Sequence, residues 1–125
     1  MVIDSSAILA IYFSEPPARW VSQQLASADR VVMSNVNLAE VLMRLRDKDP
    51  ARADTFEQRL LSERIEFVAP DVRQALLAAS ARLRFPFNFG DCFAYALAKS
   101  RDLPLLTLDR DFRAADIAVL LPPGT

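Results

Sequence analysis

Val2-Ile3-Asp4-Ser5-Ser6-Ala7-Ile8-Leu9 opens the chain with a short apolar run that stops on an acid. The two serines can cap a helix, which we predict over residues 7–13. Four further apolar runs of strand length follow, at residues 31–33, 65–68, 105–107 and 117–121. Because stretches with helical spacing separate these runs, the pattern favours an α/β fold, a three-layer α/β/α sandwich around a mostly parallel five-stranded sheet.

The helices between the strands are predicted from apolar spacing and from capping residues. Ser34-Asn35 caps one that ends at Asp49-Pro50, and its apolar stripe comprises Val36, Ala39, Leu42, Met43 and Leu45. A loop is expected over residues 85–90, after which Asp91 opens a helix over residues 92–101. The remaining predicted helices cover residues 17–27, 51–63, 72–83 and 109–114.

Missing residue types exclude several kinds of chemistry. The 125-residue chain has no histidine, so histidine-based acid–base catalysis, Ser-His-Asp triads and histidine-ligated zinc are all excluded. Its two glycines, Gly90 and Gly124, cannot form a P-loop or a dinucleotide-binding motif. The single cysteine, Cys92, forms no intramolecular disulfide, which suits a reducing compartment. Any bound metal is therefore expected to be a hard ion with oxygen ligands.

Length and charge describe a small globular protein. The 52% hydrophobic and 25% charged composition favours one folded domain over residues 1–125. A net charge of −1 argues against a large non-specific nucleic-acid surface but allows a local basic rim. Neither a signal peptide nor an apolar run of membrane-spanning length is visible, so we expect a cytoplasmic protein with no membrane partner.

Four acids occupy equivalent places in the strand–helix alternation: Asp4, Glu40, Asp91 and Asp109. Two of them follow strands directly, and the others lie at or near the start of helices. In a parallel sheet these places share one edge, where ligands bind. Each acid also has a structural explanation: an N-cap for Asp91 and Asp109, an ion pair or cap for Asp4, and an exposed helix position for Glu40. Together they predict a carboxylate cluster, whose mutual repulsion a divalent cation such as Mg²⁺ relieves.

Four stretches surround these acids: Val2-Ile3-Asp4-Ser5-Ser6-Ala7-Ile8-Leu9, Asn37-Leu38-Ala39-Glu40-Val41-Leu42, Gly90-Asp91-Cys92-Phe93-Ala94-Tyr95-Ala96-Leu97-Ala98 and Leu105-Leu106-Thr107-Leu108-Asp109-Arg110-Asp111-Phe112. In this order they resemble the four motifs of the PIN-domain family, and within it they are most similar to VapC-type toxins. The resemblance implies the strand order 3-2-1-4-5 and a metal-dependent endoribonuclease. It also implies a homodimer that a small cognate antitoxin holds inactive.

The resemblance also implies roles for individual residues. Asp4, Glu40, Asp91 and Asp109 match the family's acidic positions. We assign Asp4 and Asp91 as the principal ligands of Mg²⁺, with Mn²⁺ as an alternative ion. Glu40 and Asp109 are expected to position metal-bound waters or to hold a second ion. Ser6 and Thr107 match hydroxyl positions that support the ligands, and Asp111 is a further acid beside the site.

Substrate and partner contacts are open to two interpretations each. Arg44, Arg110 and Arg113 either hold RNA phosphates or are ordinary solvated cations. Phe87 and Phe89 are candidates for stacking on unpaired RNA bases, although core packing is the favoured interpretation. Core packing is also the default for a second set of aromatic residues, some of which can instead line a groove for an antitoxin helix: Tyr12, Phe13, Trp20 and Phe56.

Two rival functions remain for such a sequence. The first is a catalytically inactive PIN-type interaction module, against which the retention of all four acids argues. The second is an aspartyl-nucleophile phosphatase built on Asp4. That class usually has a second acid two residues later, where this chain has Ser6, and a lysine in the site, whereas only Lys48 and Lys99 are available.

Overall fold

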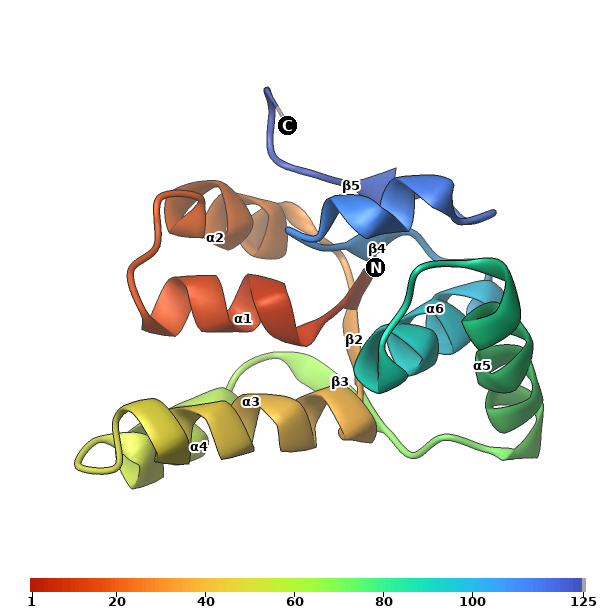
Figure 1. Ribbon diagram of the computed structural model, residues 1–125. Helices are drawn as coiled ribbons and strands as arrows, with labels where there is room; N and C mark the ends of the chain where they lie inside the picture. Colours follow the sequence, from red (N-terminus) through yellow and green to blue (C-terminus); the bar gives the residue numbers. More distant parts are fainter. Residues whose placement is uncertain (125) are drawn as a thin grey trace.

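The computed structural model describes residues 1–124 as a twisted sheet with helices on both sides (Figure 1). The strands are β1 Val2–Ile3, β2 Val31–Ser34, β3 Ile65–Val68, β4 Leu105–Leu106 and β5 Val119–Leu120. The helices are α1 Ser5–Tyr12, α2 Ala18–Ser27, α3 Asn35–Lys48, α4 Ala53–Leu61, α5 Val72–Arg84 and α6 Phe89–Arg101, with a 3₁₀ helix, η1, over Arg110–Ala114. The predicted alternation of strands and helices is confirmed.

The sheet has the order β3-β2-β1-β4-β5, and each of its pairings is parallel. The predicted strand order and parallel arrangement are therefore both correct. β1 lies in the centre, where Val2 pairs with Val32 on one side and with Leu105 on the other. Because all strands run the same way, the residues that follow β1, β2 and β4 meet at one edge of the sheet.

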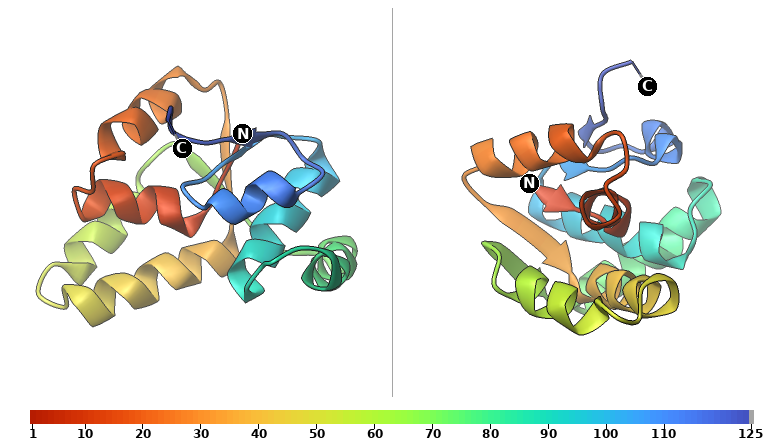
Figure 2. Two further views of the ribbon diagram at one scale, coloured as in Figure 1. Left: turned by 45° about the horizontal axis from the view of Figure 1, so that its top comes forward. Right: turned by 90° about the vertical axis from the view of Figure 1, so that its left-hand side faces the viewer.

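Alternating side chains divide the core into two halves, one on each face of the sheet. Val2 and Leu105 pack with α5 and α6, whereas their neighbours Ile3 and Leu106 pack with α1, α3 and α4. Two further views show the helices distributed on the two sides (Figure 2). The three-layer α/β/α sandwich is thus confirmed, and the continuous apolar runs reflect strands covered on both faces.

The register of α3 differs from the prediction. Its fully buried positions are Asn37, Val41 and Leu45, whereas Met43 of the predicted stripe is exposed. The sequence-based stripe followed apolar side chains, and it missed that a polar residue occupies the innermost position of the first turn. The amide nitrogen of Asn37 is hydrogen-bonded in this buried position.

The segment between α5 and α6 also departs from expectation. The predicted loop ends earlier, since Asn88 caps α6 and the helix begins at Phe89. Phe87 is buried against Phe112, with ring centroids 4.6 Å apart, so its favoured interpretation as a core residue is confirmed. For Phe89 the core interpretation is wrong, because 71% of its surface is exposed on the first turn of α6.

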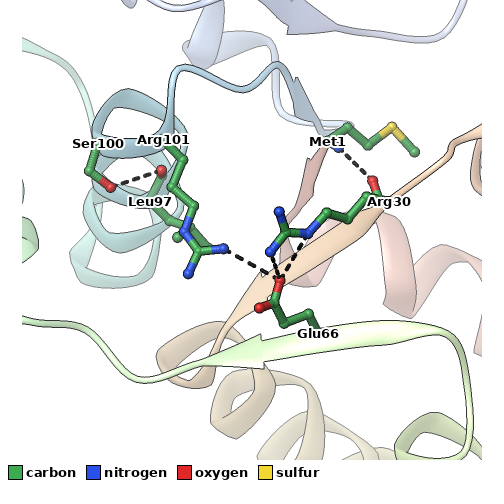
Figure 3. Close-up of polar contacts among 6 residues, drawn as sticks. All are labelled: Met1, Arg30, Glu66, Leu97, Ser100 and Arg101. Carbon is green, nitrogen blue, oxygen red and sulfur yellow. Dashed lines mark hydrogen bonds and ion pairs between the residues drawn. The ribbon is translucent and has the colours of Figure 1, made fainter.

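The amino-terminal edge of the sheet is held by charged groups (Figure 3). Glu66 of β3 pairs with Arg30 at 2.5 Å and with Arg101 at 3.4 Å, and the amino group of Met1 donates to the Arg30 carbonyl. These pairs are exposed, so each contributes little to stability. The four predicted site acids, Asp4, Glu40, Asp91 and Asp109, lie at the opposite edge. No helix within residues 1–124 combines the length and the apolar character needed to cross a bilayer.

Candidate functional site

A cleft of about 390 Å³ opens at the carboxyl edge of the sheet and brings the four predicted acids together. Asp4 follows β1 and Asp109 follows β4, while Glu40 comes from α3 and Asp91 from α6. Leu9, Phe13 and Leu108 form an apolar wall. Arg44 is the only cationic side chain that lines this cleft among residues 1–124. The cleft is therefore acidic, with one arginine at its boundary.

Asp4 is the most deeply buried of these acids, with 4% of its surface exposed. Its Oδ1 accepts hydrogen bonds from the Ser6 hydroxyl at 2.7 Å and from the Ala7 amide at 3.2 Å, while its Oδ2 accepts from the Thr107 hydroxyl at 2.5 Å. Asp4 thus caps α1 itself, and the expectation that Ser5 and Ser6 cap this helix is wrong. The capping carboxylate thus also accepts from both hydroxyls, so the cap and the hydroxyl contacts share one side chain.

Burial raises the pKa of Asp4 to about 6, although its three hydrogen bonds act in the opposite direction and the charge of Asp109 adds a smaller rise. Desolvation outweighs hydrogen bonding here because the carboxylate is cut off from water. At neutral pH the ionised form is only modestly favoured. A cation near Asp4 would favour that form strongly.

Ser6 and Thr107 connect the ends of β1 and β4 through their hydroxyl groups. Ser6 Oγ accepts from the Leu108 amide at 3.1 Å, and Thr107 Oγ1 accepts from the Asp109 amide at 3.0 Å. Each hydroxyl also donates to Asp4. The two residues therefore fix the Asp4 carboxylate relative to the segment that carries Asp109.

Asp91 lies in the first turn of α6 without being its N-cap. Asn88 caps the helix, and the Asp91 carboxylate accepts from the Asn88 amide at 3.0 Å, which completes a capping box. Burial raises the pKa of Asp91 to about 6, the Asn88 amide opposes this, and the charges of Asp109, Asp4 and Glu40 raise it further. The charges of neighbouring acids in the cleft therefore act on Asp91, and that of Asp109 acts on Asp4 as well.

Asp109 combines a structural role with its place in the cleft. Its Oδ1 accepts from the Asp111 amide at 2.9 Å, so it caps η1, as the structural interpretation proposed. Asp109 nevertheless lines the cleft. Asp111 is exposed on η1 and is not among the residues that line the cleft, so its position beside the metal site stays a prediction.

Glu40 is half-buried and held on three sides. Its Oε1 accepts from the Ser5 hydroxyl at 3.2 Å and from the Asn37 amide at 2.8 Å. A Cβ added to Gly90 would overlap the Glu40 carboxylate, so only glycine leaves room for it. Sequence reasoning missed the contributions of Asn37, Ser5 and Gly90. The sequence contained one indication of the Asn37 contact: Asn37 is polar and lies one helical turn before Glu40, in an otherwise apolar segment.

The side chains fit a hydrated divalent cation better than a bare one. Within residues 1–124, no group of three or more acidic or cysteine side chains converges closely enough to ligate an ion directly. Mg²⁺ usually keeps several of its waters, and the cleft has room for water between carboxylates and ion. The donors are all hard oxygens, and their charge is uncompensated except by Arg44. The residues present therefore fit such an ion.

The other candidate side chains lie in the cleft, in the core or on the exposed surface. Arg44 lines the cleft, whereas Arg110 and Arg113 are exposed on η1. The default core interpretation holds for Phe56, which is buried and packs on Tyr12 with ring centroids 4.9 Å apart. Tyr12, Phe13 and Trp20 are half-buried, and Phe13 faces the cleft.

Comparisons with known proteins agree with this geometry. The PIN-domain family model matches residues 1–118. Ribonuclease VapC36 from Mycobacterium tuberculosis is 36% identical over 126 residues, covering 94% of this chain and 91% of the relative. The crystal structure of M. tuberculosis VapC20, described as a sarcin-ricin loop cleaving toxin, superimposes with a TM-score of 0.81 at 20% identity, covering 97% and 98% of the two chains.

A third comparison concerns an assembly. A toxin–antitoxin complex from Klebsiella pneumoniae contains a chain that superimposes with a TM-score of 0.74 at 22% identity, covering 97% of this chain and 96% of that one. At such identities the two solved structures establish the fold. The family match and the relative at 36% identity show that the chain belongs to the PIN-domain family. Within that family its curated relatives are VapC ribonucleases.

Proposed function

We propose that the chain is a Mg²⁺-dependent endoribonuclease that acts as the toxin of a toxin–antitoxin pair. The observation that carries this proposal is the convergence of Asp4, Glu40, Asp91 and Asp109 in one cleft at the carboxyl edge of the sheet. Hydrolysis of a phosphodiester without histidine needs another source of activated water, and a carboxylate-bound metal is the usual one. The similarity to VapC36, a ribonuclease, supports RNA as the substrate.

Each residue then has a defined task. Asp4 and Asp91 would hold the ion, and Glu40 and Asp109 would accept hydrogen bonds from its waters or hold a second ion. When bound, Mg²⁺ lowers the pKa of water and neutralises charge on the phosphate. Ser6 and Thr107 keep the Asp4 carboxylate in one orientation. Arg44, at the boundary of the cleft, can receive a phosphate of the RNA.

The experiment that tests this function is cleavage of an end-labelled RNA pool by the purified protein in Mg²⁺, Mn²⁺ or EDTA, with metal binding followed by calorimetry. Cleavage that requires the divalent ion supports the proposal. Protein that neither cleaves RNA nor binds Mn²⁺ would refute it. The remaining function would then be the inactive PIN-type interaction module, a binding protein with an unused cleft.

We further propose that a cognate antitoxin docks on an apolar groove of about 280 Å³ between α1, α2 and α4. Its apolar lining includes Ile8, Ile11, Tyr12, Leu25, Leu60 and Ile65. An amphipathic helix or an extended apolar segment is the kind of partner that such a groove binds. The similarity in fold to a chain of a toxin–antitoxin complex supports this choice of partner.

The Ala26→Arg variant is expected to weaken antitoxin binding at least about tenfold, because a long charged side chain then occupies the space between the apolar residues that the partner would contact, beside the charged residues Arg59, Glu63 and Arg64 that also line the groove. Ala26 lines the groove and is exposed, so the core is left intact. Gln23→Arg, on the same helix but outside the groove, is the matched control. Titration of each variant with the antitoxin gives the affinities. Equal affinities for both variants would exclude this groove.

We also propose that the chain forms a homodimer through α5. Val72, Leu76 and Leu83 lie on one face of this helix and are 77%, 68% and 90% exposed. Exposed apolar stripes of this kind usually mark contacts with other proteins, and a two-fold dimer buries the same patch on both copies. Leu76→Glu is expected to give a monomer in sedimentation velocity, while Gln23→Glu, at an exposed position of α2, leaves the dimer intact. A monomeric parent protein would refute the dimer.

A further inference from the structure

The side-chain amide of Asn37 connects two parts of the cleft. Asn37 is 1% exposed on the inner face of α3. Its Nδ2 group donates both to Glu40 Oε1 at 2.8 Å and to the Gly90 carbonyl at 3.1 Å. Since both partners are acceptors, only the amide nitrogen can face them, which fixes the orientation of the amide. Asn37 therefore joins the acid-bearing turn of α3 to the first turn of α6.

A structural role alone does not account for a polar side chain at this position. Asn37 Oδ1 is buried and has no hydrogen-bond partner among residues 1–124. Burying an unsatisfied polar atom is unfavourable, and the neighbouring inner positions of α3 carry Val41 and Leu45. An apolar residue would pack there without leaving a polar atom unsatisfied. The two donated bonds are what an apolar residue cannot supply.

The Glu40 carboxylate has little freedom in this setting. Its Oε1 accepts from Asn37 and from Ser5, and the carboxylate lies directly against Gly90, where any Cβ would overlap it. The hydrogen bonds fall on Oε1, so within residues 1–124 Oε2 is left without one. One oxygen is thus committed to holding the side chain, and the other remains available to a ligand.

We propose that Asn37 is a positioning residue that, together with Gly90, fixes the Glu40 carboxylate so that its Oε2 can accept a hydrogen bond from a water of the bound cation. This inference rests on the proposed function, because it gives Glu40 a role toward the ion. Groups that orient metal-binding side chains typically contribute about 10- to 100-fold to metal affinity or activity. A comparable contribution is expected from Asn37, although it touches neither ion nor substrate.

The test compares Asn37→Ala with Gln74→Ala. Gln74 is also a buried amide with an unpartnered oxygen, but it lies on α5 and is not among the residues that line the cleft. Mn²⁺ affinity is measured by calorimetry, and the Mg²⁺ concentration for half-maximal RNA cleavage is measured separately. Asn37→Ala is expected to weaken Mn²⁺ binding and to raise the half-activating Mg²⁺ concentration, each about tenfold. Gln74→Ala is expected to leave both metal measurements unchanged.

Gly90→Ala provides a second variant. Unlike Asn37→Ala, it does not shorten a buried side chain, so a loss of folding stability does not complicate its result. Gly90 lies within α6, where alanine suits the backbone, so the protein folds while the added methyl displaces the carboxylate. Its Mn²⁺ affinity should fall as in Asn37→Ala. In a Glu40→Gln background, Asn37→Ala should add little, because residues that act through one another are non-additive.

The outcomes separate the inference from the function on which it rests. If the parent protein binds Mn²⁺ and cleaves RNA, but Asn37→Ala and Gly90→Ala keep the parental Mn²⁺ affinity, the positioning role is wrong and the ribonuclease stands. Full additivity with Glu40→Gln would also overturn it. If the parent neither binds Mn²⁺ nor cleaves RNA, the proposed function fails, and the inference fails with it.

Discussion

The Asp4→Asn variant is expected to lose at least about 100-fold in RNA cleavage at saturating Mg²⁺, equivalent to about 2.7 kcal/mol of transition-state stabilisation. Asparagine keeps the shape of the side chain and can still accept the bonds from Ser6 and Ala7 through its oxygen. What it removes is the negative charge at the most buried of the four acids. A neutral amide is a much weaker partner for a divalent cation.

Asp71→Asn is the matched control for this prediction. Asp71 caps α5 by accepting from the Gln74 amide at 2.8 Å, just as Asp4 caps α1, but it is not among the residues that line the cleft. The same substitution there removes a capping carboxylate and should leave cleavage within about twofold of the parent, because caps act mainly on stability. Cleavage by Asp4→Asn at the parental rate, still abolished by EDTA, would exclude Asp4 as a principal ligand.

The four acids could be found from the sequence because their placement follows from topology. In a parallel sheet, a residue that follows the end of a strand lies at the ligand-binding edge whatever its exact contacts. Locating the ends of two strands in the sequence was therefore enough to place Asp4 and Asp109 there. Glu40 required only that α3 follow β2 closely, whereas α6, which carries Asp91, follows α5 and not a strand, so the position of Asp91 rested on the helix start and on its motif. Burial on both faces made the strands themselves visible as short apolar runs.

The supporting contacts were not predictable in the same way, because they depend on helix register and rotation. Asn37 is buried and donates hydrogen bonds to Glu40 and to Gly90. Gly90 is 53 residues away in the sequence, so no local sequence pattern predicts that contact. Phe87 and Phe89 are similar in the sequence but differ in burial, since α6 begins between them. A cap shifted by three residues, from Asp91 to Asn88, placed Phe89 on the exposed first turn of α6 and so overturned its assignment, while that of Phe87 was unaffected.

In EDTA, the metal-free protein is expected to be more stable at pH 5 than at pH 7. The pKa of Asp4 rises from 3.8 in the unfolded chain to about 6 in the folded protein, mainly through burial, and the pKa of Asp91 is raised to about 6 as well. A carboxyl group with a raised folded-state pKa binds its proton more tightly when folded. Unfolding is therefore opposed more strongly as pH falls from 7 through 6 toward 4.

The size of this effect is set mainly by Asp4. Over its whole titration, a shift from 3.8 to about 6 corresponds to about 3 kcal/mol in the free energy of unfolding, of which about 1.3 kcal/mol falls between pH 7 and pH 5, and the half-buried Asp91 contributes less. Asp116 and Glu66, whose pKa values are lowered by their hydrogen bonds to Tyr95 and Arg30, titrate below this range and do not interfere. Urea unfolding at pH 5 and pH 7 in EDTA measures the difference directly.

Asp4→Asn should remove most of the pH dependence between pH 5 and pH 7, while Asp71→Asn should retain it. Saturating Mg²⁺ should reduce or reverse it, because the ion binds the ionised carboxylates and so favours the folded protein more at pH 7 than at pH 5. A protein that is equally stable at both pH values in EDTA would show that the pKa values of Asp4 and Asp91 are not raised in the folded protein. The cleft would then hold both carboxylates ionised at no cost without a cation, and the two side chains would give no reason to expect a bound ion.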